Sequence, residues 1–313
     1  MKMKLRIYTG TAGLIFLAVL MIADLLTGGL PSREILIYLR LPRVLTAILA
    51  GIALSLSGAQ MQSIFSNPLA DPYIMGISSG AALGAAIATM TGTGAGMTAG
   101  ITVALAASLG AMVAAAIILV ASRQFRSATT LLIFGIMLSF IVNAVIPLLQ
   151  AGAEAESLKI YFSWTSGSFS NTTWHQIIMM TVAISAGAAI TLNCTKDLDI
   201  IMFGDEFASM AGARPEKIRL HALLSSSIMT GAVTAFCGPI GFAGIIAPHI
   251  AGYIFSTSSH RIKLPGAMLT GSIICVAADL LSRAGDTPVP IASTMAFVGI
   301  PVIMYMLIKR PMI

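Results

Sequence analysis

The residues of this sequence that could act as acids, bases or nucleophiles are few and lie far apart. The segment GISSG at 76–80 fits the GxSxG pattern of serine hydrolases, but that pattern is active only on a strand-turn-helix elbow. Here it lies in a stretch rich in Ala, Gly and Ser that is typical of a helix. His249 stands alone in an apolar segment, where a hydrogen bond to a neighbouring carbonyl is favoured over catalysis or metal binding. His221 and His260 are predicted to lie in loops or at helix ends.

Motifs for binding nucleotides, metals or cofactors are absent from the sequence. No segment matches GxxxxGK[ST], the loop that cradles ATP phosphates, so any ATP-driven role requires a separate ATPase subunit. The cysteines Cys194, Cys237 and Cys275 form no CxxC pair and no metal-ligand spacing, and they are predicted to be small core residues. We therefore expect this chain to bind neither a cofactor nor a metal of its own.

The composition indicates a protein that lies in a membrane. Of the 313 residues, 57% are hydrophobic and 10% are charged, whereas about 25% of the residues of a soluble domain are charged. So few charged side chains cannot cover the surface of a soluble fold of this length. A soluble enzyme, a nucleic-acid-binding protein and a disordered chain are excluded. The net charge of +6 is interpreted as a sign of membrane orientation.

Ten apolar segments predict one all-α transmembrane domain over residues 1–313. A spanning helix needs about 20 residues. The candidate spans are approximately 7–27, 41–61, 75–91, 98–121, 129–150, 173–194, 220–238, 240–256, 264–283 and 288–308. The first is expected to be an uncleaved helix, because no clear A-x-A cleavage site follows it. The eighth is the least regular, and the aromatic stretch 151–172 favours a short extra helix at the membrane interface.

Basic residues predict the orientation of these spans. If the N-terminus is cytoplasmic, 13 of the 18 Lys and Arg residues fall on the cytoplasmic side. Such an excess is typical of cytoplasmic loops. With an even number of spans, both termini are then expected in the cytoplasm.

Small residues predict close helix packing in one region. Gly76, Gly80 and Gly84 recur every four residues. A small-xxx-small stripe of this kind lets two membrane helices approach closely, and we interpret it as a packing surface.

Three arginines are predicted near the outer ends of spans. Arg40 and Arg43 are three residues apart and would share a helix face. Arg283 ends the ninth span on the same side, with Asp279 four residues earlier as a possible partner. The residues alone leave two interpretations open, which are anchoring at the membrane interface and a basic surface that docks an acidic partner.

Two polar segments interrupt the apolar pattern on the cytoplasmic side. In the charged loop 195–219, Asp205 and Glu206 could begin a short helix that Gly212 ends. Such a helix favours docking of another protein over a solvated connector. The segment 60–72 has two prolines and several polar groups at or near membrane depth, which makes it a candidate gate.

The assembled segments resemble the permeases of ABC importers for iron chelates and vitamin B12, the FecCD type of the type II importers. The resemblance covers nearly the whole chain. It rests on five blocks, at residues 39–86, 203–212 (FGDEFASMAG), 238–250 (GPIGFAGIIAPHI), 260–269 (HRIKLPGAML) and 277–283 (AADLLSR). It implies ten helices per subunit, two permeases around a central pathway, two ATP-binding subunits and one substrate-binding protein.

The resemblance also implies roles for individual residues. Those expected to meet acidic residues of the binding protein are Arg40, Arg43 and Arg283. Those expected in the coupling helix that contacts the ATPase are Gly204, Asp205, Glu206, Ala208 and Gly212. Those expected at the cytoplasmic gate are Asn67, Leu69 and Thr129. Many relatives have an arginine and a leucine where this chain has Ser209 and Ala211, so its ATPase contact is expected to differ in detail.

The expected function is therefore binding-protein-dependent import by ATP-driven alternating access, without chemistry on this chain. The resemblance implies an iron chelate (siderophore or haem) or cobalamin as cargo, with oxyanions such as molybdate among relatives, and a homodimer is the simpler assembly. An ion-coupled secondary transporter would require acidic groups near the membrane midplane. Asp24, Asp71 and Asp279 fall near predicted span ends instead. An intramembrane enzyme has only the GxSxG segment and His249 in its favour.

Overall fold

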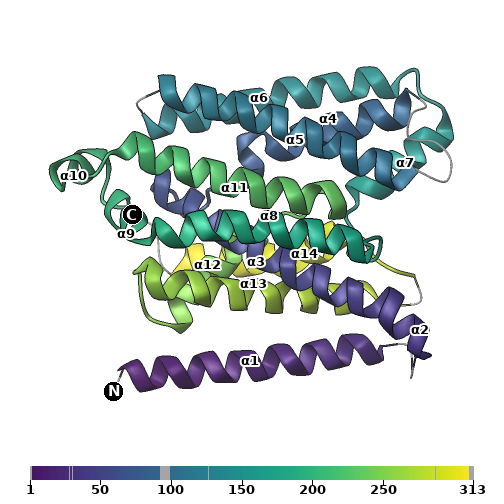
Figure 1. Ribbon diagram of the computed structural model, residues 1–313, viewed down its shortest axis with the longest axis horizontal. Helices are drawn as coiled ribbons and strands as arrows, with labels where there is room; N and C mark the ends of the chain where they lie inside the picture. Colours follow the sequence, from purple (N-terminus) through teal and green to yellow (C-terminus); the bar gives the residue numbers. More distant parts are fainter. Residues whose placement is uncertain are drawn as a thin grey trace.

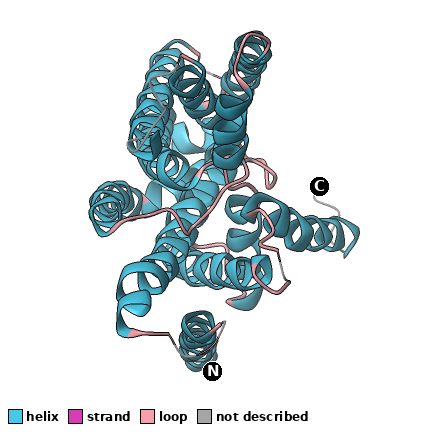
Figure 2. Cartoon of the chain, turned by 90° about the vertical axis from the view of Figure 1, so that its right-hand side faces the viewer, coloured by secondary structure: helices cyan, strands magenta, loops and turns pink. Residues whose placement is uncertain are grey.

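The computed structural model describes residues 2–27, 29, 31–91, 99–125, 127–285 and 287–309, and all regular structure in these ranges is helical (Figures 1 and 2). The ten predicted spans are found as α1 (Lys2–Leu26), α3 (Leu41–Ile64), α4 (Ile77–Met90), α5 (Ala99–Gln124), α6 (Ala128–Gln150), α8 (Trp174–Asn193), α11 (Pro215–Cys237), α12 (Ala243–Ile254), α13 (His260–Ser282) and α14 (Ile291–Lys309). The shorter elements are α2 (Arg33–Ile35), η1 (Leu36–Arg40), η2 (Pro72–Met75), α7 (Ala155–Thr165), α9 (Thr195–Ile201) and α10 (Asp205–Met210). The predicted all-α membrane fold and the extra helix after the fifth span are confirmed.

The helices form one bundle in which α3 runs through the middle and α1 lies at one edge (Figure 1). α3 packs against α8, α11, α12 and α13, whereas α1 contacts mainly α13. The start of α1 and the end of α14 lie at the same end of the bundle as α9 and α10 (Figure 1). We call this the inner end, and the opposite end, which holds α7, the outer end. Arg126 and Arg310, which contribute to the predicted charge excess, lie outside the described residues.

Two of the ten helices are too short to cross a membrane by themselves. Seven described helices have the length and hydropathy of a full span, and α4, α12 and α14 count as shorter apolar helices. α4 and α12 contain 14 and 12 residues, or about 21 and 18 Å, against about 30 Å of hydrocarbon. The eighth span therefore begins later than predicted, because 238–242 is not helical and Phe242 has a φ of 71°.

Non-helical backbone precedes both short helices and is partly buried: Ala70, Asp71 and Ile240 are buried, whereas Ser66 and Leu69 are exposed. The segment 65–71 leads to η2 and α4, and 238–242 leads to α12. The two are joined where the Ile240 N–H donates to the Tyr73 hydroxyl at 3.1 Å. Irregular backbone at membrane depth is tolerated where protein surrounds it.

The second span begins earlier than predicted, since Arg33–Ile64 forms one continuous helical segment. Its irregular part is the π-helical turn η1, in which the Leu41 N–H bonds to the Leu36 carbonyl. Pro42 follows directly and has no N–H to donate. A π turn at this point accommodates the proline without ending the helix.

Small residues close the contact between α4 and α5, as the glycine stripe predicts. A Cβ atom on Gly80 would collide with Ala114 and the Gly110 carbonyl, and one on Gly84 would collide with the Ala106 carbonyl. Gly76 differs, because it begins α4 and faces α6. Two further pairs bring backbones together in the same way, Gly51 with Gly271 and Gly58 with Gly244.

Candidate functional site

The short helix α10 projects from the inner end of the bundle (Figure 1). Gly204 precedes it with a φ of 96°, and Gly212 follows it with a φ of 81°. These left-handed backbone conformations favour glycine, so both residues shape the loop. Ala208 is fully buried, whereas Glu206 is exposed. Of the five predicted coupling residues, Glu206 therefore offers the most accessible side chain.

An ion pair fixes α10 to the bundle. Asp205 pairs with Arg219 of α11, and the Arg219 side chain is almost completely buried. A buried guanidinium needs a charged partner. Asp205 therefore holds α10 against α11, a role that the sequence analysis did not assign to it.

Apolar side chains make up the exposed face of the α10 region. Phe203, Phe207 and Met210 are 73%, 47% and 82% exposed, and the two phenyl rings lie 5.2 Å apart. Grouped large apolar side chains on an exposed surface mark a contact for another molecule. These three residues were not among those predicted from the sequence, although their spacing of four and three within a charged loop was a usable signal.

The gate candidate 65–71 presents Leu69 at the surface. The Asn67 carboxamide oxygen accepts the Leu69 N–H at 2.9 Å, which forms a tight local turn. Leu69 is 37% exposed. Thr129 is exposed in the first turn of α6, and no hydrogen bond joins it to Asn67 or Leu69 within the described residues.

α12 holds the gate candidate from the side. His249 Nε2 lies 2.7 Å from the Pro68 carbonyl oxygen, and a carbonyl only accepts, so Nε2 carries the proton. The predicted hydrogen bond of His249 to a neighbouring carbonyl is confirmed. The Gln62 amide donates to the carbonyls of Gly244 and Ile245 at 3.3 and 3.1 Å.

Two of the three outer arginines belong to a buried ion cluster. Arg43 makes a bidentate contact with Asp279, at 2.7 and 2.8 Å. Arg283 lies 3.1 Å from Asp279 and 2.5 Å from Asp24. This cluster of two arginines and two aspartates joins α1, α3 and α13 and is neutral overall. The predicted pairing of Asp279 with Arg283 is confirmed, and Arg43 is a further partner.

Arg40 has a different environment. Its Nη1 donates to the carbonyls of Leu25 and Gly29, at 2.5 and 2.9 Å. Among the residues that the structure describes, no carboxylate pairs with Arg40, whose partners there are uncharged carbonyls. Arg33 is exposed nearby.

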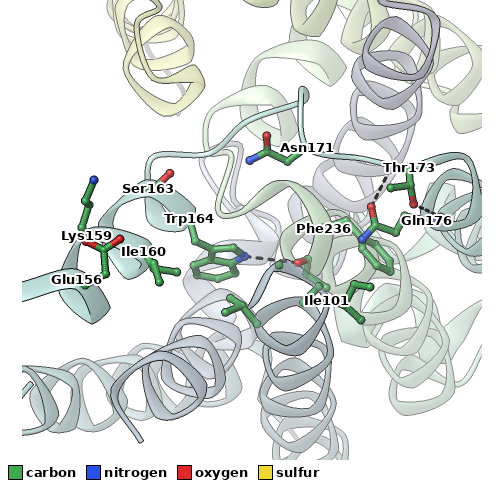
Figure 3. A pocket seen from close by; sticks show the side chains of 14 residues that line it. Ile101, Glu156, Lys159, Ile160, Ser163, Trp164, Asn171, Thr173, Gln176 and Phe236 are labelled. Carbon is green, nitrogen blue, oxygen red and sulfur yellow. Dashed lines mark hydrogen bonds between the residues drawn. The ribbon is translucent and has the colours of Figure 1, made fainter. Parts of the chain in front are cut away.

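A cavity of about 450 Å³ lies at the outer end between α5, α7, α8 and α11 (Figure 3). Trp164 lies within it and donates from Nε1 to the Ala235 carbonyl at 3.5 Å. Its polar lining includes Glu156, Lys159, Asn171 and Gln176. These groups can bind a polar ligand, but the described lining residues include no histidine, cysteine or second carboxylate for acid–base catalysis.

The GxSxG segment does not form a nucleophile elbow. It lies at the start of α4, and Ser78, the serine of the pattern, is in the first turn of this helix. The part of the chain that the structure describes has no strand, so the required strand-turn-helix geometry is missing. Among these residues, no group of three His, Cys, Asp or Glu side chains could hold a metal ion.

A bundle of apolar helices with irregular segments before two short helices and a projecting short helix has the architecture of a membrane permease. The chain belongs to the FecCD transport family, whose model matches residues 5–309. It is 32% identical over 281 residues to the hemin transport system permease protein HmuU of Yersinia pestis, covering 88% of this chain and 84% of that protein. It is 31% identical over 285 residues to the cobalamin import system permease protein BtuC of Halobacterium salinarum, covering 90% and 76%.

A solved structure agrees with this assignment. A metal-chelate type ABC transporter in an inward-facing conformation superposes with a TM-score of 0.88 at 26% identity, covering 97% of this chain and 99% of that chain. The protein is therefore the permease subunit of a binding-protein-dependent ABC importer and lies in the cell membrane. Permeases of this family are transport subunits that work with a separate ATPase and a substrate-binding protein.

Proposed function

We propose that this permease moves an iron chelate, either a ferric siderophore or haem, or cobalamin across a bacterial or archaeal inner membrane by alternating access. The hemin and cobalamin permeases among its relatives support these cargoes. Two copies of the chain form the pathway, with both termini in the cytoplasm. Two ATPase subunits bind below and one substrate-binding protein binds above. The chain itself hydrolyses nothing.

The α10 region carries this proposal. Its exposed face of Phe203, Phe207 and Met210 fits an apolar groove on an ATPase, with Glu206 beside it for a charged contact. The ion pair between Asp205 and Arg219 attaches α10 to α11, so that movement of the ATPase is transmitted to α11. Gly204 and Gly212 set its ends, and Ala208 packs its inner side.

Replacing the exposed face tests this contact. Phe207→Ala combined with Glu206→Ala is expected to abolish co-purification of the ATPase and uptake, while the permease remains folded. Glu216→Ala is the matched control, because Glu216 is also exposed at the inner end. Asp205→Ala is measured separately, since it also removes the ion pair with Arg219. Normal ATPase association in the Phe207/Glu206 variant would remove α10 from the proposal.

We assign docking of the binding protein to Arg40, Arg43 and Arg283. Arg43 and Arg283 are already paired within the chain, so Arg40 is the sharpest test. Arg40→Glu is expected to lower the affinity for the binding protein and to make this affinity less dependent on salt concentration. Lys217→Glu, at the exposed inner end, is the control of equal charge change. Equal docking by both variants would contradict the assignment for Arg40.

We assign the cytoplasmic gate to Asn67, Leu69 and Thr129, with Leu69 of one copy facing Leu69 of the other. In a variant without the native cysteines, Leu69→Cys is expected to give a disulfide-linked dimer under oxidation. Val182→Cys is the control, because Val182 is 66% exposed but lies on α8, outside the gate segment 65–71. A monomeric Leu69→Cys protein would contradict a gate between identical copies.

The cargo is tested with the assembled transporter. The chain is expressed with its genomic neighbours, and ATP hydrolysis is measured with the binding protein loaded in turn with ferric siderophore, haem and cobalamin. Stimulation by one loaded form identifies the cargo. Uptake driven by a proton or sodium gradient without any ATPase would instead support the ion-coupled secondary transporter.

A further inference from the structure

A chain of hydrogen bonds crosses three helices at the inner end of the bundle. Asp199 Oδ1 of α9 lies 2.7 Å from His260 Nδ1, at the start of α13. His260 Nε2 lies 2.7 Å from the Ser63 hydroxyl, near the end of α3. His260 and Ser63 are 0% and 1% exposed. Three residues that are far apart in sequence are thus joined in one buried connection.

Asp199 also caps the first turn of α13. Its Oδ1 accepts the His260 N–H at 2.7 Å, and its Oδ2 accepts the Ser259 hydroxyl proton at 3.1 Å. Ser259 occupies the N-cap position but makes no side-chain cap bond of its own. Partial burial would raise the pKa of Asp199, but the hydrogen bonds from His260 and Ser259 hold this pKa below its usual range. The carboxylate on α9 therefore does the work of a helix cap.

The proton count shows that this connection is satisfied in either charge state of His260. A carboxylate only accepts, so His260 Nδ1 donates to Asp199. The single Ser63 proton can go to His260 Nε2 or to the Ala59 carbonyl, which is also 2.7 Å away. The first arrangement fits a neutral imidazole, and the second fits an imidazolium that donates from both nitrogens. In both arrangements, His260 and Ser63 keep their hydrogen-bond partners within this connection.

The geometry resembles a Ser-His-Asp catalytic triad, but the site cannot serve as one. A nucleophile must be reachable by its substrate. Ser63 is almost completely buried, and it does not line the cavity at the outer end. The three residues therefore hold α9, α13 and α3 in position and do not catalyse a reaction.

The two ends of the Asp199–His260–Ser63 connection adjoin the two elements that move in the proposed mechanism, α10 and the gate segment 65–71. Residues 202–204 join α9 directly to α10, and α10 packs mainly on α9 and α11. Ser63 lies two residues before the gate segment 65–71. Movement of α10 can be transmitted to the bundle through its contact with α11. It can also be transmitted through α9, where Asp199 connects by way of His260 and Ser63 to the gate segment.

We propose that Asp199, His260 and Ser63 are positioning residues that couple movement of α10 to the gate segment 65–71. This inference rests on the proposed function. Breaking either hydrogen bond separates ATP hydrolysis from opening of the gate. ATPase binding is untouched, because the exposed face of α10 is unchanged.

The test uses the complete transporter, with its ATPase and binding protein, in proteoliposomes. Asp199→Ala and Ser63→Ala are each expected to retain ATPase association and ATP hydrolysis and to lower uptake per ATP about tenfold. The double variant is expected to be no worse than either single variant, because both remove the same connection. Asp197→Ala is the matched control on the same helix. Independent, multiplying effects, or an equal loss in the control, would overturn the proposal.

A conformational readout separates coupling from a merely structural role. In a variant without the native cysteines, spin labels at Leu69→Cys of the two copies report the gate distance with and without ATP. Asp199→Leu, which keeps a similar size but has no acceptor oxygen, serves where Asp199→Ala does not fold. The ATP-dependent distance change is expected to disappear in the variants while hydrolysis continues. A normal distance change would refute the coupling role, whereas failure of the wild-type chain to bind any ATPase would refute the proposed function instead.

Discussion

At the scale of single residues, the outer arginines show how burial changes the meaning of a charged side chain. In sequence, Arg43 and Arg283 fit exposed anchors equally well. In the fold, their charges balance Asp279 and Asp24, whose side chains are 0% and 1% exposed. A carboxylate among apolar helices is costly unless a partner faces it. Arg43 and Arg283 thus stabilise the fold, whether or not they also contact a binding protein.

Removing Arg43 is therefore expected to destabilise the protein. Arg43→Ala leaves Asp279 with Arg283 alone and should cost up to about 3 kcal/mol, whereas Arg43→Ala with Asp279→Ala should recover much of the loss. The measurement is thermal unfolding in mild detergent. Arg33→Ala, at an exposed position, should change stability by no more than about 0.5 kcal/mol. An equal effect of Arg33→Ala and Arg43→Ala would contradict the role of the cluster.

Asp199 should make stability depend on pH in a defined direction. Its folded pKa is lowered by the hydrogen bonds from His260 and Ser259, so its stabilising effect is full above the unfolded pKa of about 3.9. The effect is lost as pH falls through the lower folded pKa. The stability difference between wild type and Asp199→Asn should be largest near pH 7 and shrink towards pH 4 and below. Asp197→Asn, on the same helix but outside the hydrogen bonds to His260 and Ser259, is the control in the same melting series.

At the scale of elements, the helices are placed by small residues that let backbones meet. In lipid, apolar side chains gain little by leaving their surroundings, so close van der Waals contact decides which helices pair. The α4–α5 contact depends on Gly80, Gly84 and Gly110. The short α4 and α12 can exist at partial length because such contacts enclose the irregular backbone before them.

Adding one methyl group at this contact is expected to disturb it. A Cβ on Gly110 would collide with the Gly80 carbonyl, so Gly110→Ala should destabilise the protein by about 1–3 kcal/mol. Gly100 lies on the same helix with nothing within 4 Å of such a Cβ. Gly100→Ala should be neutral or stabilise by up to about 1 kcal/mol. The two melting temperatures are compared in detergent, and a harmless Gly110→Ala would show that α4 and α5 are not closely packed.

At the scale of the whole molecule, the two ends of the bundle carry different structural features. The inner end holds α10, the gate segment and the connection through His260, and the outer end holds the arginines and the cavity of Figure 3. An even number of helices returns the chain to the inner end. An importer needs this polarity, since its ATPase and its binding protein act from opposite sides.

The polarity predicts which positions react from outside the cell. In a variant without native cysteines, a membrane-impermeant maleimide should label Arg33→Cys in intact spheroplasts and should label Met210→Cys only after lysis. Both positions are exposed in the fold, so accessibility depends on the membrane side alone. Labelling of Met210→Cys before lysis, with Arg33→Cys protected, would invert the orientation.

The sequence alone determined the ten apolar segments, the charged inner loop with its helix, the breaks around Pro68 and Pro239, and the family blocks. These are local features, because apolar runs, glycines and prolines act on the backbone that carries them. The tertiary structure decided which charges pair and which polar groups connect. Arg43 meets Asp279 across 236 residues, and Ser63 meets His260 across 197. Such pairs follow from the order in which helices pack, and no local pattern in the sequence encodes that order.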